Sequence, residues 1–261
     1  MELLTFNCSA LPLLTPDVDA RLDLLARELR RLDPDLACLQ ELGLSAQVSR
    51  LAARLSAWPY GFWQPRWPGL VAGGLALFSK RPLRGASFHP YAEQCSWLGP
   101  GYLSRLAVKG WMRLDLGDPG PVVLHTHLMA DYGASRRTWA DYRGLQERQA
   151  AELASFAARD LAAGRRVVVA GDLNATPASE AFGRLTGLGL RDALGGSAEP
   201  SMVPESSFPR PWAIPRRLER LDYVLDSAPG ARGFWTLDEV HAFGSRRMSL
   251  SDHRGLLAHL A

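Results

Sequence analysis

Val167-Val168-Val169-Ala170-Gly171-Asp172-Leu173-Asn174 joins a run of apolar residues to two polar ones. Three valines and an alanine predict a central strand, because such runs are typical of strands covered on both faces. Asp172 and Asn174 follow that strand directly. Since a sheet holds the residues at its edge rigidly, this position suits side chains that bind or react.

The same combination of an apolar strand and a polar residue at its end recurs along the chain. A first strand, Glu2-Leu3-Leu4-Thr5-Phe6, ends at Asn7, and a second, Leu36 to Gln40, ends at Glu41. The other polar residues beside predicted strands are His127, Asp222, Asp252 and His253. If these strand ends meet at one edge, their side chains form one oxygen-rich pocket.

The order of the predicted elements indicates an α/β protein. Helices are predicted over Asp19–Leu32, Leu44–Ala57 and Arg136–Ala163. The further predicted strands are Leu75–Phe78, Leu106–Leu116, Val122–Thr126, Leu221–Leu225, Phe234–Val240 and Leu256–Leu260, with loops over 58–74 and 195–217. Because several strands are adjacent in sequence and outnumber the helices, we expect two mixed β-sheets packed face to face with helices outside, a four-layered α/β sandwich.

Length and composition bound the remaining possibilities. The chain has 261 residues, 47% of them hydrophobic, and no repeat or linker divides it, so residues 1–261 are expected to form a single domain. A net charge of +3 is too small to require a nucleic-acid partner. Three cysteines without metal spacing, and the lack of a long apolar run or export signal, favour a cytoplasmic protein. We expect it to be a monomer.

The polar residues at the strand ends are mostly carboxylates and amides. Such a set favours a hard divalent cation over structural zinc, because zinc sites are built from cysteine and histidine. Mg²⁺ needs only a few carboxylates, since it keeps several waters. These residue types do not separate Mg²⁺ from Mn²⁺, so both ions stay open.

Six short motifs resemble, in this order, those of the endonuclease/exonuclease/phosphatase superfamily, which has the DNase I-like fold. They are Asn7, Gln40-Glu41, Thr126-His127-Leu128, Gly171-Asp172-Leu173-Asn174, Leu221-Asp222-Tyr223 and Ser251-Asp252-His253. One alone is weak, but six in order over the whole chain are specific. Within the superfamily, three segments are similar to the neutral sphingomyelinases: Gly73–Lys80, Lys109-Gly110-Trp111 and His125–Tyr132.

The resemblance implies a metal side of the site. Glu41 would be the principal metal ligand and Asp252 would complete that side, while Asn7 would contact metal-bound water or phosphate. Lys80 and Lys109, which match the Ser-Lys and Lys-Gly positions, would lie near the phosphate. In the family an acid often precedes the second lysine, but residues 94–108 contain none, so a switch that depends on that pair would be absent.

The resemblance also implies the residues that act on the phosphodiester. Asp172 would hold or deprotonate the attacking water, and Asn174 would position a phosphoryl oxygen. His253, oriented by Asp222, would act with that water or on the developing charge, and His127 would donate to a non-bridging oxygen. A cation and several donors are needed because the negative charge of a phosphodiester repels nucleophiles.

The implied function is Mg²⁺-dependent hydrolysis of a phosphodiester. Its most specific form is a sphingomyelinase-like phospholipase C that works on a phospholipid or related phosphodiester, with a membrane surface as the expected place of the substrate. A nuclease or phosphomonoesterase of the same fold, with nucleic acid as a substrate, is the alternative. A catalytically silent scaffold would lack at least one of these residues, and none is missing. Aromatic residues between Trp58 and Trp67 suit a membrane interface, a choline-like cation or simple packing.

Overall fold

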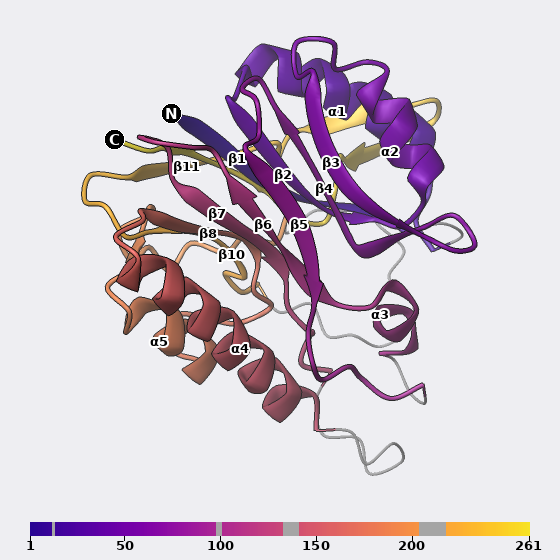
Figure 1. Cartoon of the computed structure of the whole chain (residues 1–261). Coiled ribbons are helices and arrows are strands. Elements are labelled where there is room, and N and C mark those ends of the chain that lie inside the picture. Colours follow the sequence, from indigo (N-terminus) through magenta and orange to yellow (C-terminus); the bar gives the residue numbers. More distant parts are fainter. Residues whose placement is uncertain (12–13, 98–100, 133–140, 204–217) are drawn as a thin grey trace.

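The computed structural model describes residues 1–11, 14–97, 101–132, 141–203 and 218–261, and two six-stranded sheets dominate it (Figure 1). The first sheet has the order β11-β14-β1-β2-β4-β3. Its strands are β1 (Glu2–Ala10), β2 (Leu36–Leu42), β3 (Tyr60–Arg66), β4 (Leu70–Ser79), β11 (Arg232–Thr236) and β14 (Gly255–His259). Only β1 and β2 pair in parallel, and the other neighbours are antiparallel.

The second sheet repeats this arrangement with the order β5-β6-β7-β8-β10-β9. Its strands are β5 (Gly85–Pro90), β6 (Gly110–Asp115), β7 (Val122–His127), β8 (Val167–Asp172), β9 (Arg191–Asp192) and β10 (Asp222–Asp226). Here β7 and β8 form the one parallel pair. Both sheets are therefore mixed, and in each the parallel pair lies near the centre.

The two sheets bury a shared apolar layer between them. Leu3, Cys38 and Leu77 of the first sheet pack in one cluster with Val123 and Val168 of the second. Every residue of β8 is buried, as predicted from its apolar run. Burial of this area on both faces supplies the main driving force for folding and fixes the distance between the sheets.

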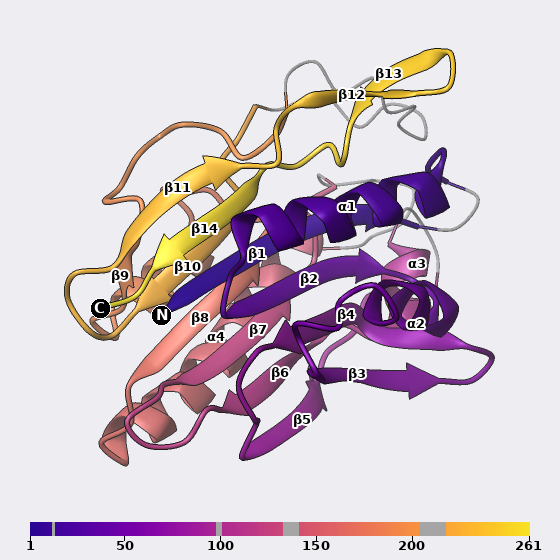
Figure 2. The ribbon, with the colours of Figure 1, turned by 90° about the horizontal axis from the view of Figure 1, so that it is seen from above.

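Helices cover the outer faces of both sheets (Figure 2). α1 (Val18–Leu32) and α2 (Ser45–Ala52) pack on the first sheet, where the α1 stripe of Leu22, Leu25 and Leu29 joins the apolar core. α4 (Tyr142–Ala162) and α5 (Glu180–Thr186) cover the second sheet. The order helix, sheet, sheet, helix confirms the predicted four-layered α/β sandwich. None of the described helices is both long and apolar enough to cross a membrane.

The prediction of a loop over 58–74 was wrong in part, because this segment contains β3 and the start of β4. Its prolines and glycines suggested a loop, yet β3 is the edge strand of its sheet. An edge strand tolerates Pro65, which lies at an irregularity in the register with β4. The same segment buries Trp58, whose indole N–H donates to the carbonyl of Pro34.

The strand predicted over Leu106–Leu116 was also wrong in its first residues. α3 (Tyr102–Ala107) occupies them, and Val108 ends the helix in a left-handed conformation, with φ 58°. The strand β6 then begins at Gly110, where a Cβ atom would lie only 2.3 Å from the carbonyl oxygen of His89. The glycine thus permits the close pairing of β5 and β6.

Helix boundaries differ from the predictions for local reasons. α4 begins at Tyr142 because Asp141 caps it, accepting a hydrogen bond from the Gly144 N–H at 2.8 Å; residues 133–140 of the predicted helix lie outside the described residues. α2 ends at Ala52 and continues as turns. The predicted strand Phe234–Val240 is divided at Leu237, which has φ 58°, so that Val240 starts the hairpin β12 (Val240–Phe243) and β13 (Arg246–Ser249). Of the long loop 195–217, residues 204–217 lie outside the described residues.

Candidate active site

Except for Lys80, the predicted site residues lie where the central strands of both sheets end. In the second sheet, His127 at the end of β7 pairs in register with Asp172 at the end of β8, and Asp172 pairs with Asp222 at the start of β10. In the first sheet, Asn7 of β1 pairs with Gln40, the neighbour of Glu41. The parallel pairs thus bring their carboxyl ends to one edge, as expected from the sequence.

Asn7 links the two sheets at this edge. Its side-chain nitrogen donates to Glu41 Oε1 at 3.2 Å and to Asp172 Oδ2 at 2.9 Å. Its side-chain oxygen accepts from the Ser9 N–H at 3.0 Å. In this arrangement Asn7 holds two carboxylates close together, and its oxygen, the atom that could bind a cation, is directed to the backbone.

The conformation of Glu41 is set by its surroundings. Its φ of 57° is unusual for a residue with a side chain, and such strain persists only where the structure enforces it. Gly74, with φ 66°, packs against it: a Cβ atom there would lie 3.4 Å from Glu41 Cα. The side chain of Glu41 keeps 22% of its exposure, so this carboxylate is open to a ligand from solution.

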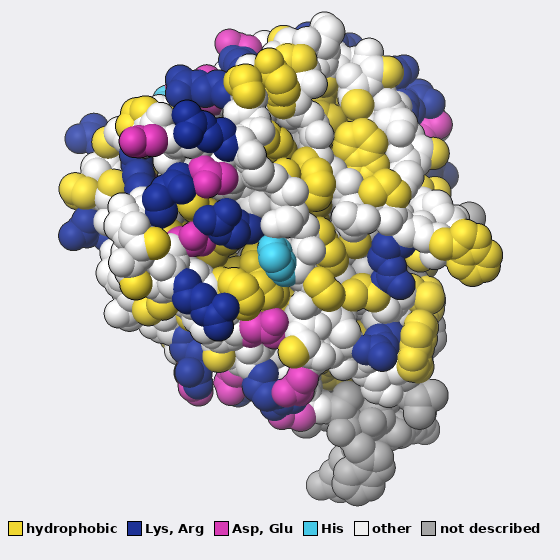
Figure 3. Space-filling view, in the orientation of Figure 1, with side chains coloured by type: hydrophobic (Ala, Val, Ile, Leu, Met, Phe, Trp, Pro, Cys, Tyr) yellow, Lys and Arg dark blue, Asp and Glu magenta, His cyan; other side chains and the backbone are white. Residues whose placement is uncertain are grey.

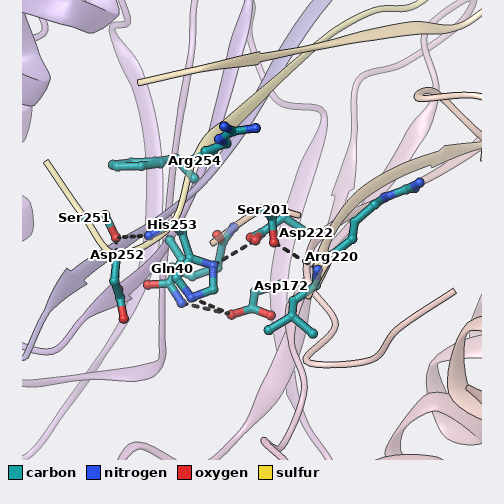
Figure 4. Close-up of polar contacts among 12 residues, drawn as sticks. Gln40, Asp172, Ser201, Arg220, Asp222, Ser251, Asp252, His253 and Arg254 are labelled. Atoms are coloured by element: carbon teal, nitrogen blue, oxygen red, sulfur yellow. Dashed lines mark hydrogen bonds and ion pairs between the residues drawn. The ribbon is translucent and has the colours of Figure 1, made fainter. Parts of the chain in front are cut away.

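His253 lies between two aspartates (Figure 4). Its Nδ1 is 2.8 Å from Asp222 Oδ2, and its Nε2 is 3.9 Å from Asp172 Oδ2. Burial opposes the charged imidazole, but the carboxylate and hydrogen bond of Asp222, and then the charge of Asp172, raise the pKa of His253 well above its usual value. Burial, followed by the charge of Asp222, raises the pKa of Asp172 to about 7. Asp172 can therefore accept a proton near neutral pH, beside an imidazole that is held in its charged form.

The loop that bears His253 is held by backbone hydrogen bonds. The Val203 N–H donates to the Asp252 carbonyl at 2.8 Å, and the Arg254 N–H donates to the Ser201 carbonyl at 2.7 Å. Ser251 Oγ accepts from the His253 N–H at 3.1 Å. These contacts fix the imidazole before any substrate arrives, which is what a catalytic group requires.

His127 completes the ring of groups around Asp172. Its Nε2 is 3.5 Å from Asp172 Oδ2 and 3.9 Å from Glu41 Oε1. Burial, followed by the positive charges of Lys109 and His253, keeps the pKa of His127 well below its usual value. It is thus a neutral imidazole, which can donate one hydrogen bond to an oxygen without titrating near pH 7.

Asn174 acts on Asp172 through its backbone. The Asn174 N–H donates to Asp172 Oδ1 at 2.8 Å, and φ of 49° turns the chain back at this point. The Asn174 side chain donates to the Leu128 carbonyl at 3.0 Å, and Gln146 Nε2 donates to the Asn174 carbonyl at 2.7 Å. Both oxygens of Asp172 are therefore oriented, one by Asn7 and the other by Asn174.

The two lysines lie in different places. Lys109 is 5% exposed, and burial lowers its pKa to about 8 although the charges of Glu41 and Asp172 oppose that shift. It is within electrostatic reach of Glu41 and Asp172. The prediction for Lys80 was wrong: it follows β4 at the end paired with Leu36, five residues before Glu41 along β2. There Lys80 Nζ forms an ion pair with Asp33 at 2.8 Å, at the end of the strands opposite to the site.

Arg21, which the motifs did not indicate, supports the site from α1. It is 2% exposed, and its guanidinium donates to the carbonyls of Cys8 at 2.9 Å, Ser9 at 3.0 Å and Leu250 at 2.7 Å. It thereby joins the irregular last part of β1, after Asn7, to the segment before Asp252. A signal exists in the sequence: Arg21 precedes Leu25 by four residues, which places an arginine on the apolar face of the helix.

Gln40 and His125 form a second contact between the sheets, deeper than the site. Gln40 Nε2 lies 2.8 Å from His125 Nε2 and also donates to Thr5 Oγ1 at 2.9 Å. Both side chains are fully buried, and burial lowers the pKa of His125 to about 3. His125 is thus neutral and does not face the reacting edge, unlike His127 two residues later.

The acidic residues of the edge fit a divalent cation. Asp172, Asp222 and His253 each place one potential ligand atom within 4.8 Å of the others. However, Asp222 and His253 are already bonded to each other, and a hard cation prefers oxygen ligands. Burial, and then the charge of Asp252, raise the pKa of Glu41. A cation beside Glu41 would relieve this repulsion, so the chemistry of the donors fits Mg²⁺ or Mn²⁺ best on the Glu41 and Asp252 side.

Comparison with known proteins places this geometry in a family. Human sphingomyelin phosphodiesterase 2 is 27% identical over an alignment that covers 100% of this chain and 64% of that protein. The crystal structure of sphingomyelinase C from Streptomyces griseocarneus has a TM-score of 0.70 at 19% identity, over 99% of this chain and 98% of that one. Staphylococcus aureus beta toxin with bound magnesium ions has a TM-score of 0.72 at 17% identity, over 99% and 98%.

Because their sequence identity with this chain is low, the two solved structures show a shared fold and nothing more. The chain spans less than two thirds of the length of the curated relatives it matches, 64% in the case of the human protein. Residues 4–253 match the sequence pattern of the endonuclease/exonuclease/phosphatase family, and this range includes every motif from Asn7 to His253. The chain therefore belongs to the endonuclease/exonuclease/phosphatase family.

Proposed function

We propose that the protein is a metal-dependent phosphodiesterase that hydrolyses a phospholipid headgroup ester in the manner of a phospholipase C. The observation that supports this most strongly is the position of His253, bonded to Asp222 on one side and facing Asp172 on the other. A buried imidazole and a carboxylate with a pKa of about 7 can hold a water molecule and accept its proton.

The remaining residues would bind and orient the phosphodiester. His127 can donate a hydrogen bond to a non-bridging oxygen, and Lys109 offers a positive charge beside Glu41 and Asp172. Asn7 and Asn174 keep the Asp172 carboxylate in position. The groups are fixed by the ends of four strands, so little reorganisation is needed when negative charge develops on the phosphoryl oxygens.

Glu41 and Asp252 would hold the cation, with Mg²⁺ favoured and Mn²⁺ as the second choice. A bound divalent cation supplies charge neutralisation for the phosphoryl group. The donor set of this edge supports that role, because the Glu41 side chain keeps 22% exposure and its pKa is raised by burial and then by the charge of Asp252. A structure of beta toxin from Staphylococcus aureus, which has the same fold, contains magnesium ions.

The choice of a phospholipid rests on the relatives. The human protein that matches the whole chain is named a sphingomyelin phosphodiesterase, and one solved structure with this fold is a sphingomyelinase C. The catalytic residues alone do not select a lipid, because nucleases and phosphomonoesterases of this fold need the same chemistry. The substrate class is therefore the part of the proposal that an assay must test first.

The test compares four substrates in parallel: sphingomyelin and lysophosphatidylcholine in mixed micelles, plasmid DNA, and bis-p-nitrophenyl phosphate. Each is assayed with Mg²⁺, with Mn²⁺ and with EDTA. Metal-dependent release of phosphocholine without nicking of DNA supports the proposal. Nicking of DNA without lipid turnover assigns the protein to the nuclease alternative. His253→Ala is the matched control that identifies turnover by a contaminant, because no activity of this site should survive it.

A further inference from the structure

Large apolar side chains and arginines form an exposed surface between the β3–β4 turn and α3. Trp67, in that turn, is 90% exposed, and Trp97, before α3, is 59% exposed. Tyr102 and Leu106 of α3 are 46% and 40% exposed. Together with Arg66 and Arg105 these residues are termed the aromatic rim. Tryptophans this exposed are uncommon, since most tryptophan side chains are largely buried.

Contacts between the two elements make the aromatic rim continuous. Arg66 Nη1 donates to the Leu106 carbonyl at 3.2 Å, which joins the end of β3 to α3. The Arg105 guanidinium lies 5.6 Å from the centre of the Trp97 ring. Trp67 directly follows Arg66 in the chain. The exposed side chains therefore belong to one patch and not to separate surface residues, which would need no explanation.

The aromatic rim lies beside the candidate active site. The Ser45 N–H donates to the Gly69 carbonyl at 2.9 Å, and the Val71 N–H donates to the Gly43 carbonyl at 3.1 Å. These bonds join the turn that bears Trp67 to the residues that follow Glu41. On the other side, α3 leads within two residues to Lys109. Both parts of the rim are thus attached to groups at the reacting edge.

The charge of the aromatic rim is positive. Residues 58–70 and 94–108 contain no aspartate or glutamate, while Arg66 and Arg105 lie among the exposed rings. Figure 3 shows hydrophobic and basic side chains together over the β3–β4 turn and α3, on the right of the view, whereas most acidic side chains of this face lie elsewhere. Aromatic rings with flanking arginines are the composition of surfaces that enter the headgroup region of a bilayer.

We infer that the aromatic rim binds the surface of a phospholipid bilayer and presents the adjacent site to lipid headgroups. The rings would enter the interface, and the two arginines would pair with lipid phosphates. The inference rests on the proposed function, because it supplies the surface on which a lipid substrate would be met. Proteins and single-stranded DNA also bind aromatic rings, but the aromatic rim favours the bilayer, because it combines bulky exposed apolar side chains with phosphate-binding charge beside the proposed phosphodiesterase site.

The test uses the double variant Trp67→Ala/Trp97→Ala and the control Phe234→Ala. Phe234 is 50% exposed on β11, at the edge of the first sheet opposite β3, so it matches the rim in exposure but not in position. Binding to vesicles of phosphatidylcholine with 20% phosphatidylserine is measured by cosedimentation in EDTA, where no turnover occurs. We expect the double variant to bind at least about tenfold more weakly and the control to bind like the wild type.

Catalysis is measured separately on bis-p-nitrophenyl phosphate, which is soluble and needs no membrane. The double variant should keep the wild-type rate there and lose turnover of vesicle lipid. The inference is overturned if the wild type does not bind vesicles, if the double variant binds them equally well, or if Phe234→Ala weakens binding to the same extent. Rim-dependent binding of DNA without binding of vesicles overturns it as well. If rim-dependent vesicle binding is found but no phosphodiester is cleaved, the proposed function fails and the rim remains a membrane surface.

Discussion

Asp222 and Asp172 are register partners on neighbouring strands, yet only Asp222 is bonded to an imidazole, at 2.8 Å from His253 Nδ1. Asp172 lies on the far side of the same ring, 3.9 Å from Nε2. The two acids therefore differ in role although both are buried. Asp222 orients and charges the imidazole, whereas Asp172 lies beside Asn7 and His127, at the edge proposed to bind the substrate.

Asp222→Asn should lower the pKa of His253, because burial already opposes its charged form and the principal opposing carboxylate would be lost. Turnover should fall about 10²- to 10⁴-fold, the range for loss of acid–base catalysis. NMR titration of the imidazole gives the pKa, and bis-p-nitrophenyl phosphate gives the rate. Asp226→Asn is the matched control: it is equally buried on β10 but pairs with Arg166. An unshifted His253 pKa in Asp222→Asn would contradict the assigned role.

Asp172→Asn should change how stability depends on pH. The folded-state pKa of Asp172, about 7, lies above its unfolded value, so the folded protein binds this proton more tightly. The wild type must therefore lose stability relative to the variant as the pH rises toward 7. In EDTA, the difference in free energy of unfolding should grow in favour of the variant by an amount on the order of 2 kcal/mol between pH 5 and 7. Urea unfolding at several pH values measures it; a difference independent of pH contradicts the raised pKa.

Much of this arrangement could be predicted from the sequence. The apolar run ending at Asp172 predicted a central strand, and polar residues after successive strands predicted a shared edge. Strand order could not be read from these runs, because pairing depends on contacts between distant segments. The edge strand β3 was missed since Pro65 disfavours strands except at an edge, which only the assembled sheet defines.

The site itself was predictable as a set of residues but not as a geometry. Lys80 matched a motif, yet β2 and β4 are antiparallel, and their register places Lys80 at the opposite end from Glu41. The role of Arg21 depends on carbonyls at Cys8 and Leu250, which only the fold brings together. Backbone hydrogen bonds of this kind leave almost no trace in the sequence, apart from a charged residue on an apolar helix face.

Substitution of Lys109 and of Lys80 should have different effects on activity. Lys109→Met removes a positive charge near Glu41 and Asp172 and should lower kcat/KM for bis-p-nitrophenyl phosphate by about tenfold or more. Lys80→Met should change it less than about twofold, because its partner is Asp33 at the other edge. Steady-state rates at saturating Mg²⁺ measure both. An equal effect of the two changes would mean that Lys109 acts on folding and not on the phosphodiester.

Glu41→Gln should weaken the response to metal. The variant keeps the shape of the side chain but loses the charge that would hold the cation, so the Mg²⁺ concentration for half-maximal activity should rise by more than about tenfold. The increase in Tm that Mg²⁺ gives the wild type should shrink as well, since only binding to the folded state stabilises it. Asp33→Asn, an acid on the opposite edge, is the control. A normal Mg²⁺ response in Glu41→Gln would place the cation elsewhere in the site.

Arg21→Met tests whether a buried guanidinium on α1 positions the site. The change leaves the carbonyls of Cys8, Ser9 and Leu250 without these donors, which should cost roughly 3 kcal/mol or more of stability. A loss of stability alone would be structural. Because Leu250 precedes Asp252 by two residues and Cys8 follows Asn7, the variant should also bind Mg²⁺ more weakly at a temperature where circular dichroism shows it folded. Arg113→Met, which breaks the pair of Arg113 with Asp160 on the outer side of the second sheet, should lower stability and leave the Mg²⁺ affinity unchanged. Equal Mg²⁺ affinity in Arg21→Met and the wild type would restrict Arg21 to folding.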